Sequence, residues 1–547
     1  MADLTQLVPP KDLSLHDRTT VFQYFFCLLA SFRNTAILYS KQERLSQSQR
    51  DQIEQNVQSW AEQVLDHAFI VCGEPSGEKP QLDEYADTST GHLPPLPAPE
   101  IITRILNTVL FLSLSTTKEY SARTRTFLAL LGSVDEQLIV SALQNPEQTI
   151  QETQKHAQNA KETRAKMGKT LRMVGVGLGA VAGGVLVGVT GGLAAPLVGA
   201  GVSTLLGVLG VGGTTVGLLA SGLASSGAIC GALFGAYGAR SSSKMVERHT
   251  REIRDLDIVP VHKQSKSQET LAVRLCVSGW LNSPEDVVAP WTIFGGDDTY
   301  ALQWEVEHLQ SLSNALYSLL KLNAMRYLQK EVIRRTVFAS LMSSLAPIAW
   351  LKIGQIIDND WSNGIALATK AGVVLADLLK QRVFGNRPVT LTGYSLGGLV
   401  IFEALKCLAA LPPAETNHLI QDVYLFGTPA TTDPTVWASV RRLVSGRVVN
   451  GYSQNDYVLA VLSRLTLGGW GVAGLRPVDA MGIENVLCKD VTGHTKWRGM
   501  IGRSLQQCGA PGVIDARVAA QEAEEITTDD ERELTKEEVD QLVIRDA

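Results

Sequence analysis

The segment TGYSLGG contains a serine in a setting that could make it a nucleophile. Ser395 lies between Gly393 and Gly397 in a Gly-x-Ser-x-Gly pattern, directly after the run PVTLTGY and directly before the apolar stretch LGGLVIFEALKCLAA. A sharp turn between a strand and a helix exposes a serine hydroxyl, and the two glycines form a nucleophile elbow without obstructing side chains. We therefore expect Ser395 to attack a carbonyl carbon. The alternative is a turn serine or helix N-cap in an ordinary α/β unit.

A serine hydroxyl needs a base to become a nucleophile. Only two of the nine histidines follow Ser395 in the chain. His418 precedes the next expected strand and so belongs to the opposite edge of a parallel sheet. His494 follows the last expected strand, where its loop can reach the serine. Order and position therefore favour His494 as the general base.

The acid that orients the histidine should lie between the two in chain order and follow a strand. Asp456 comes just after the β-rich run GRVVNGYS and meets both conditions. Asp433, after the preceding strand, is the alternative acid. Either aspartate could instead cap the next helix. We favour Asp456.

Two backbone N–H groups are needed to bind the oxyanion that forms during attack. One should come from Leu396, the residue after the nucleophile. The other should come from the loop after an earlier strand, where the sequence CVSGWLNSPED offers Gly279 and Trp280.

Short β-rich runs alternate with helical patterns from residue 260 to residue 510, which is typical of an α/β domain with a mainly parallel sheet. A mostly helical insertion at 306–385 separates the second strand from the third, and an acidic tail follows at 511–547. The expected strands are 271–279, 300–305, 388–394, 422–429, 446–453 and 484–491.

The first 170 residues show helical spacing of apolar residues and end in a coiled-coil-like stretch. Residues 171–240 contain a different element, because Met173–Ala239 includes no charged side chain and 20 glycines. This run is long enough for a transmembrane hairpin of two helices, three spans being conceivable. Basic flanks predict that both ends stay in the cytosol. Shallow insertion, or a glycine-rich helical core element, is the alternative.

The overall composition of the chain excludes some classes of function. The net charge of −6 and the pI near 5.9 provide no general basic surface for nucleic acid. Seven scattered cysteines indicate a reducing compartment, no disulfide framework and no structural zinc. The charged N-terminus lacks a secretory h-region, so we expect the protein at an intracellular membrane with its catalytic domain facing the cytosol.

Several stretches resemble the family of transmembrane and coiled-coil domain-containing protein 4, eukaryotic membrane proteins with an α/β-hydrolase-like domain. They are TGGLAAPLVGAG, VSGWL, APW, PVTLTGYSLGGLVIF, VVNGYSQNDYVLA and VTGHTKW. The similarity extends over most of residues 160–500 and is weakest in the helical N-terminal region. The resemblance implies a membrane-associated serine-hydrolase fold with Ser395, Asp456 and His494 at the matching positions. It does not indicate a substrate.

Two functions fit these observations. The first is a membrane-anchored serine esterase or lipase that acts on acyl lipids or a lipidated protein without metal or cofactor, its 306–385 helices forming a lid over an acyl pocket. The second is a hydrolase-like membrane scaffold or trafficking protein with little or no catalysis. Its binding elements would be the N-terminal helices, the loop 72–100 and the acidic tail.

Overall fold

The chain forms two compact units in the computed structural model. The first comprises residues up to 34, 57–120 and 124–235, and the second comprises 35–56, 121–123 and 236 onwards. The residues that the structure describes are 7, 13–75, 77–146, 213–234, 255–262, 270–315, 360–416, 418–456, 458–460, 462, 463 and 471–532.

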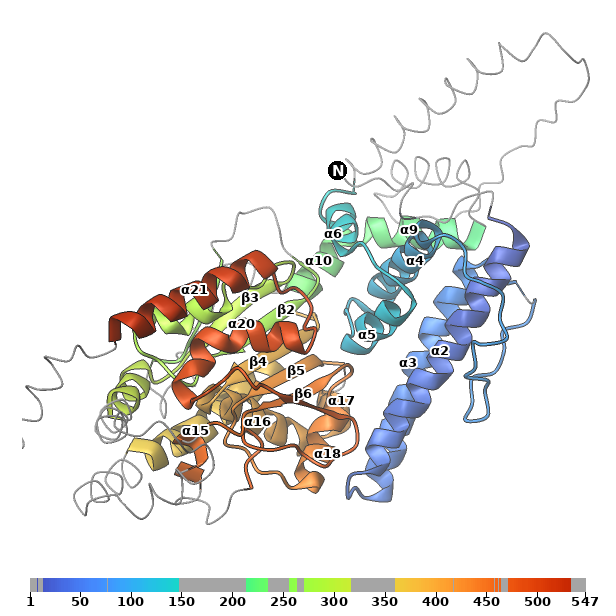
Figure 1. Ribbon diagram of the computed structural model, residues 1–547. Coiled ribbons are helices and arrows are strands. Elements are labelled where there is room, and N and C mark those ends of the chain that lie inside the picture. Colours follow the sequence, from blue (N-terminus) through green and yellow to red (C-terminus); the bar gives the residue numbers. More distant parts are fainter. Residues whose placement is uncertain are drawn as a thin grey trace, which may run out of the picture. The chain divides into compact units, whose positions relative to one another are not determined.

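The regular elements in the described part of the first unit are helices, and a loop at 72–98 joins two of them (Figure 1). The edge of the Phe127 ring contacts both Phe25 and Trp60, with ring centroids 4.9 and 6.2 Å away. The predicted coiled-coil-like end extends to residue 170. Its residues after 146 lie outside the described part of the chain. The helices of the N-terminal region, of which residues 35–56 and 121–123 count with the second unit, are α2 (Leu15–Lys41), α3 (Gln47–Val71), α4 (Pro99–Thr117), α5 (Ala122–Leu131) and α6 (Glu136–Gln144).

The described part of the glycine-rich segment is a bent pair of helices, α9 (Gly213–Ala224) and α10 (Ser226–Phe234), which meet at 62°. α9 packs on α4, and a Cβ on Gly222 would overlap Phe111 and Ser115. The glycine is therefore needed for this close approach. The rest of the predicted hairpin, 171–212 and 235–240, lies outside the described residues.

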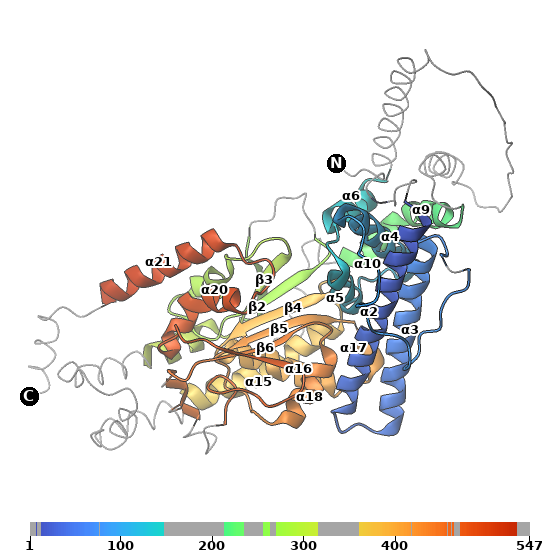
Figure 2. The same ribbon diagram turned by 45° about the vertical axis from the view of Figure 1, so that its right-hand side comes forward.

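The second unit is built around a seven-stranded sheet in the order β1-β3-β2-β4-β5-β6-β7 (Figure 2). β1 pairs antiparallel with β3, and every other neighbouring pair is parallel. Each of the six expected runs overlaps one of these strands, and β3, β5 and β7 begin one or two residues before the expected run, whereas β1 was not expected. The strands are β1 (Asp257–Pro260), β2 (Val273–Val277), β3 (Asp298–Gln303), β4 (Val389–Tyr394), β5 (Ile420–Phe426), β6 (Val448–Tyr452) and β7 (Ile483–Leu487).

Helices cover both faces of the sheet (Figures 1 and 2). One face carries α15 (Ser362–Lys380), α16 (Leu396–Ala409) and α18 (Pro434–Leu443), and the other carries α20 (Trp497–Gln507) and α21 (Asp515–Arg532). The predicted acidic tail thus begins as a helix that packs on α20, with Val518 buried. The structure therefore has a mixed, mostly parallel sheet with flanking helices, preceded by a helical region.

Two described helices, α2 and α15, have the length and composition of a membrane span, and the bent pair α9–α10 would add a third if counted as one span. α15 buries one side against α16, where a Cβ on Gly372 would stand 2.8 Å from the Val400 carbonyl oxygen. Packing on α16 therefore accounts for much of the apolar surface of α15. Of the predicted insertion 306–385, residues 316–359 lie outside the described part.

The parallel strands place their carboxyl ends along one edge of the sheet. The loops after β2, β4, β6 and β7 therefore come together there, and these loops carry all the residues expected to act. In sheets of this kind, ligands bind outside the carboxyl ends of the strands.

Candidate active site

Ser395 occupies a strained turn between β4 and α16. Its backbone has φ 54° and ψ −131°, a conformation that non-glycine residues rarely adopt. Its amide N–H donates to the carbonyl oxygen of Phe426, at 2.9 Å. A Cβ on Gly393 would stand 2.8 Å from Ile401 Cδ1, and one on Gly397 would overlap the Val277 carbonyl. The two glycines therefore allow the close backbone packing that holds the turn.

The Ser395 hydroxyl is directed to a histidine and not to the helix that follows. Although Ser395 stands at the N-cap position of α16, its side chain makes no capping hydrogen bond. Its Oγ lies 2.6 Å from Nε2 of His494, and both residues are buried. The side chain of Ser395 thus pairs with a histidine.

Asp456 completes the arrangement. Nδ1 of His494 lies 2.7 Å from Oδ2 of Asp456, which is fully buried. The amide of Leu459 donates to the other carboxylate oxygen, at 3.0 Å. Ser395, His494 and Asp456 thus form one hydrogen-bonded chain, with the serine as donor to the histidine and the histidine as donor to the aspartate. Their catalytic roles stay a prediction.

The two alternative side chains lie in other settings. Asp433 caps α18 and accepts from the backbone N–H and the hydroxyl of Thr435, a side chain that lowers the pKa of the carboxyl. His418 has Nδ1 3.0 Å from Ser121 Oγ. Burial, reinforced by Arg123 and Arg382, holds the pKa of His418 well below its usual value. The hydrogen-bonded chain contains neither residue.

The expected oxyanion residues lie at the elbow. A Cβ on Gly279 would overlap the amide nitrogens of Leu396 and Gly397, so the loop after β2 touches the first turn of α16. The indole ring of Trp280 meets the His494 ring edge-on, with centroids 5.4 Å apart. The hydroxyl of Tyr394 donates to the Trp280 carbonyl oxygen, at 2.9 Å. The role of Leu396, Gly279 and Trp280 as oxyanion donors stays a prediction.

Two neighbouring side chains at the start of α20 were missed by sequence reasoning. The indole N–H of Trp497 donates to Asp456 Oδ2, at 2.9 Å. Arg498 donates through Nε to Asp286, at 2.7 Å, while the other oxygen of Asp286 accepts the amides of Asn282 and Ser283. The sequence SPED does signal a short helix start. The pairing of its aspartate with an arginine 212 residues later has no local signal.

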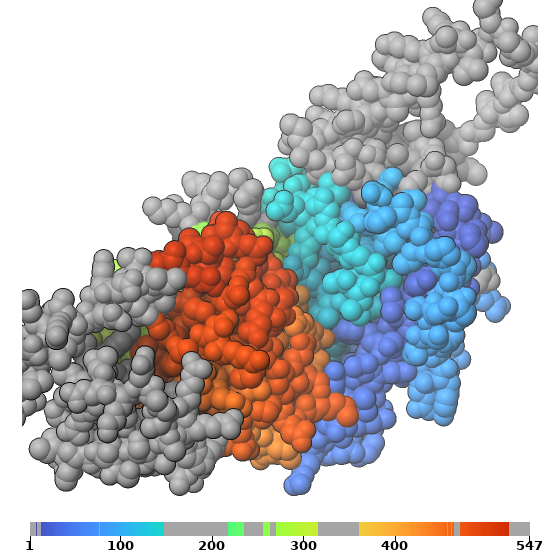
Figure 3. Space-filling model, in the orientation of Figure 1, coloured from blue at the N-terminus to red at the C-terminus, as the bar shows by residue number. Residues whose placement is uncertain are grey.

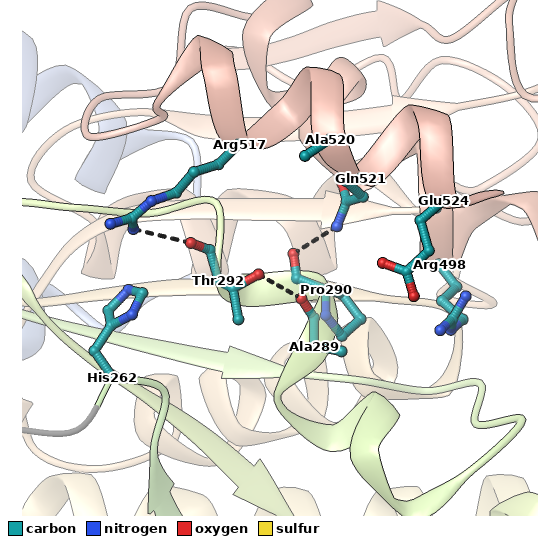
Figure 4. A pocket seen from close by; sticks show the side chains of 10 residues that line it. His262, Ala289, Pro290, Thr292, Arg498, Arg517, Ala520, Gln521 and Glu524 are labelled. Atoms are coloured by element: carbon teal, nitrogen blue, oxygen red, sulfur yellow. Dashed lines mark hydrogen bonds between the residues drawn. The ribbon is translucent and has the colours of Figure 1, made fainter. Parts of the chain in front are cut away.

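The hydrogen-bonded chain is closed off from solvent, since Ser395, Asp456 and His494 are at most 1% exposed. A cavity of about 320 Å³ lies elsewhere, between the loop after η3 (Ala289–Trp291) and the helices α20 and α21 (Figure 4). Its wall includes Arg498, Arg517 and Gln521, and Gln521 donates to the Pro290 carbonyl oxygen. α20 and α21 (red) form part of the outer surface there (Figure 3). Within the described ranges, no three His, Cys, Asp or Glu side chains are grouped to hold a metal ion.

The family model "Protein of unknown function (DUF726)" matches residues 168–510. The uncharacterized membrane protein C6F6.13c of Schizosaccharomyces pombe is 35% identical over 397 residues, which are 69% of this chain and 67% of that protein. The transmembrane and coiled-coil domain-containing protein STS1 of Oryza sativa subsp. japonica is 33% identical over 396 residues, 70% of this chain and 60% of that one. The "probable lipase MIL1" of Saccharomyces cerevisiae is 36% identical over 307 residues, 55% of this chain.

The chain spans 60% of the rice relative and 27% of the budding-yeast relative. No solved structure matches the chain. The family model nevertheless covers more than half of the chain, and the rice relative carries the name that the sequence motifs indicated. This chain therefore belongs to the DUF726 family of proteins of unknown function, and its resemblance to transmembrane and coiled-coil domain-containing proteins is confirmed.

Proposed function

We propose that this protein is a membrane-associated serine hydrolase with an α/β-hydrolase fold, which cleaves carboxylic esters of acyl lipids. The observation that carries the proposal is the hydrogen-bonded chain from Ser395 through His494 to Asp456. Three features of such hydrolases support it: the serine on a strand-to-helix elbow, the order Ser, Asp, His along the chain, and an earlier loop beside the elbow.

The first half of the reaction forms an acyl-enzyme. Ser395 Oγ bonds to the ester carbonyl carbon while its proton passes to Nε2 of His494. Asp456 holds the Nδ1–H of His494 and stabilises the imidazolium. The C–O bond to the alcohol then breaks, and the alkoxide leaves with the proton from Nε2.

The second half releases the acid. A water molecule gives a proton to His494 and attacks the acyl carbon, and the bond to Ser395 Oγ breaks as the serine recovers its proton. In both halves, the carbonyl oxygen becomes an anion. We assign its stabilisation to the amide of Leu396 and to an amide of the Gly279–Trp280 loop, which touches the elbow. No metal or organic cofactor enters this scheme.

The substrate class is supported by the relatives. One is named an uncharacterized membrane protein, and another a transmembrane and coiled-coil domain-containing protein. A third is named a probable lipase. An ester substrate at a lipid surface, either an acyl lipid or a lipidated protein, fits a hydrolase held at an intracellular membrane with its active site on the cytosolic side. The predicted lid falls mainly on residues outside the described part.

Labelling with a fluorophosphonate probe tests the proposal, because such probes bond covalently to an activated serine. The full-length protein in detergent should be labelled, and Ser395→Ala should abolish the label. Ser439→Ala is the matched control, since its hydroxyl donates only within α18, to the Val436 carbonyl oxygen. This control should label like the wild type.

Absence of labelling in the wild type, while a known serine hydrolase reacts in the same detergent, would overturn the proposal. That result would favour the hydrolase-like scaffold, with protein partners bound through the N-terminal helices. Labelling that survives Ser395→Ala would place the nucleophile at another residue. For a labelled wild type, comparison of cellular lipids with those of Ser395→Ala cells would then identify the ester.

A further inference from the structure

The carboxylate of Asp456 receives two side-chain donors on one oxygen. Oδ2 accepts from Nδ1 of His494 at 2.7 Å and from the indole Nε1 of Trp497 at 2.9 Å. Oδ1 accepts the amide of Leu459. All three side chains of this group are 0–1% exposed, so water does not compete for the carboxylate. The indole N–H is therefore one of the donors that the fold places around the Asp456 carboxylate.

The fold places the Trp497 indole with little freedom. Gly427, directly after β5, has φ 54°, and a Cβ there would overlap Nε1 of Trp497. The Phe426 ring lies 6.1 Å from the Trp497 ring, centroid to centroid. Trp497 also begins α20 immediately after the short helix η5 (His494–Lys496). The backbone that presents His494 thus presents the second donor to Asp456.

We propose that Trp497 is a positioning residue for Asp456, an inference that rests on the proposed function. A carboxylate held only by the histidine and one amide could rotate about its Cβ–Cγ bond. The indole N–H fixes Oδ2 in line with Nδ1 of His494. It also stabilises the negative charge on that oxygen. As a result, Asp456 attracts the imidazolium of His494 less strongly.

The sign of the effect follows from this charge. Without the indole N–H, Asp456 stabilises the imidazolium more strongly. The labelling rate, which needs a histidine free to accept the serine proton, then reaches its plateau at higher pH. Loss of one hydrogen bond to a buried carboxylate should shift the labelling profile by roughly one pH unit and slow probe labelling about tenfold at neutral pH.

The test compares Trp497→Phe with Trp437→Phe. Trp437 is equally buried, and its indole N–H donates to the Thr431 carbonyl oxygen, at 2.7 Å, on the opposite face of the sheet. Both variants lose a buried indole hydrogen bond, but only the first loses one to Asp456. The rate of fluorophosphonate labelling is measured against pH, and the His494 Nδ1 proton is followed by its downfield NMR resonance.

We expect the NMR titration and the labelling profile to move to higher pH in Trp497→Phe alone. If Trp497→Phe matches the wild type, or if Trp437→Phe moves equally, the inference is overturned while the hydrolase stands. If the wild type does not label but the resonance still titrates higher in Trp497→Phe, the hydrolase fails and the positioning role holds. Should Trp497→Phe not fold, Gly427→Ala, which crowds the indole, carries the same test.

Discussion

Gly279 lies against the amide nitrogen of Leu396, so close that a Cβ on the glycine would overlap it. This contact joins the loop after β2 to the first turn of α16, and it brings together the two segments assigned to the oxyanion. Only glycine lets two backbones approach so closely. A side chain at Gly279 would therefore force these two backbones apart.

Gly279→Ala should displace the loop from the elbow. Because loss of one oxyanion donor lowers kcat by about 10²–10³, we expect fluorophosphonate labelling to slow by on the order of a hundredfold. Gly493→Ala is the control: Gly493 precedes His494, has extended backbone, and has open space where a Cβ would go. Equal loss in both variants would show general sensitivity of the site to added volume and would contradict the assignment.

Replacing Asp456 or Asp433 by asparagine tests which of the two acids orients His494. Asp456→Asn keeps the shape but removes the charge that holds the tautomer of His494, so we expect a loss of roughly 10³–10⁴ in labelling rate. Asp433→Asn should leave the rate unchanged, because Asp433 bonds Thr435 at the start of α18. The measurement is the labelling rate at saturating probe. A large loss in Asp433→Asn would contradict our choice of acid.

The main elements of the site were predictable from sequence because they follow from strand ends. Ser395, Asp456 and His494 follow the strands β4, β6 and β7, whose β-branched residues mark them in the sequence, and parallel strands bring such loops to one edge. The six predicted strands were recognisable for the same reason. β1 was not, since Asp257–Pro260 is four residues long and includes a proline at its end.

The remaining features depend on contacts that no local pattern encodes. Trp497 and Arg498 look like ordinary helix residues, and only the folded chain places them against Asp456 and Asp286. The acidic composition of the tail indicated a disordered or weakly helical extension. Its start instead packs on α20, because Val518 and Gln521 face that helix. Long-range partners of this kind require the structure.

The close packing of α15 on α16 gives a test of whether α15 belongs to the sheet-bearing unit. Gly372→Val would force Cβ against Glu403 Cβ and the Val400 carbonyl oxygen, 2.7 and 2.8 Å from the glycine's ideal Cβ position. We expect the free energy of unfolding to fall by about 1–3 kcal/mol, as for other overpacked cores. Urea denaturation in detergent measures it.

Ala366→Val is the matched control on α15, because Ala366 is exposed. It should change the free energy of unfolding by less than about 0.5 kcal/mol. If α15 instead crossed a membrane away from α16, both valines would be tolerated alike. Such an outcome would contradict the packing of α15 against α16.

His418 should make the sheet-bearing unit sensitive to acid. Its pKa is lowered in the folded chain by burial and by Arg123 and Arg382, while the unfolded chain keeps the ordinary value of 6.5. Above that value the residue is neutral in both states and has no effect. As pH falls below it, only the unfolded chain takes up the proton, so stability is lost at up to about 1.4 kcal/mol per pH unit until the folded pKa is reached.

His418→Asn should remove this dependence. Asparagine tolerates the left-handed backbone at this position, φ 65°, and its amide oxygen can replace Nδ1 as partner of Ser121. Urea midpoints measured between about pH 5.5 and 7.5 should fall with acid in the wild type and less in the variant. The exposed His92, replaced in the same way, should leave the wild-type slope unchanged. A variant whose midpoint falls with acid as steeply as that of the wild type would show that another group takes up the proton.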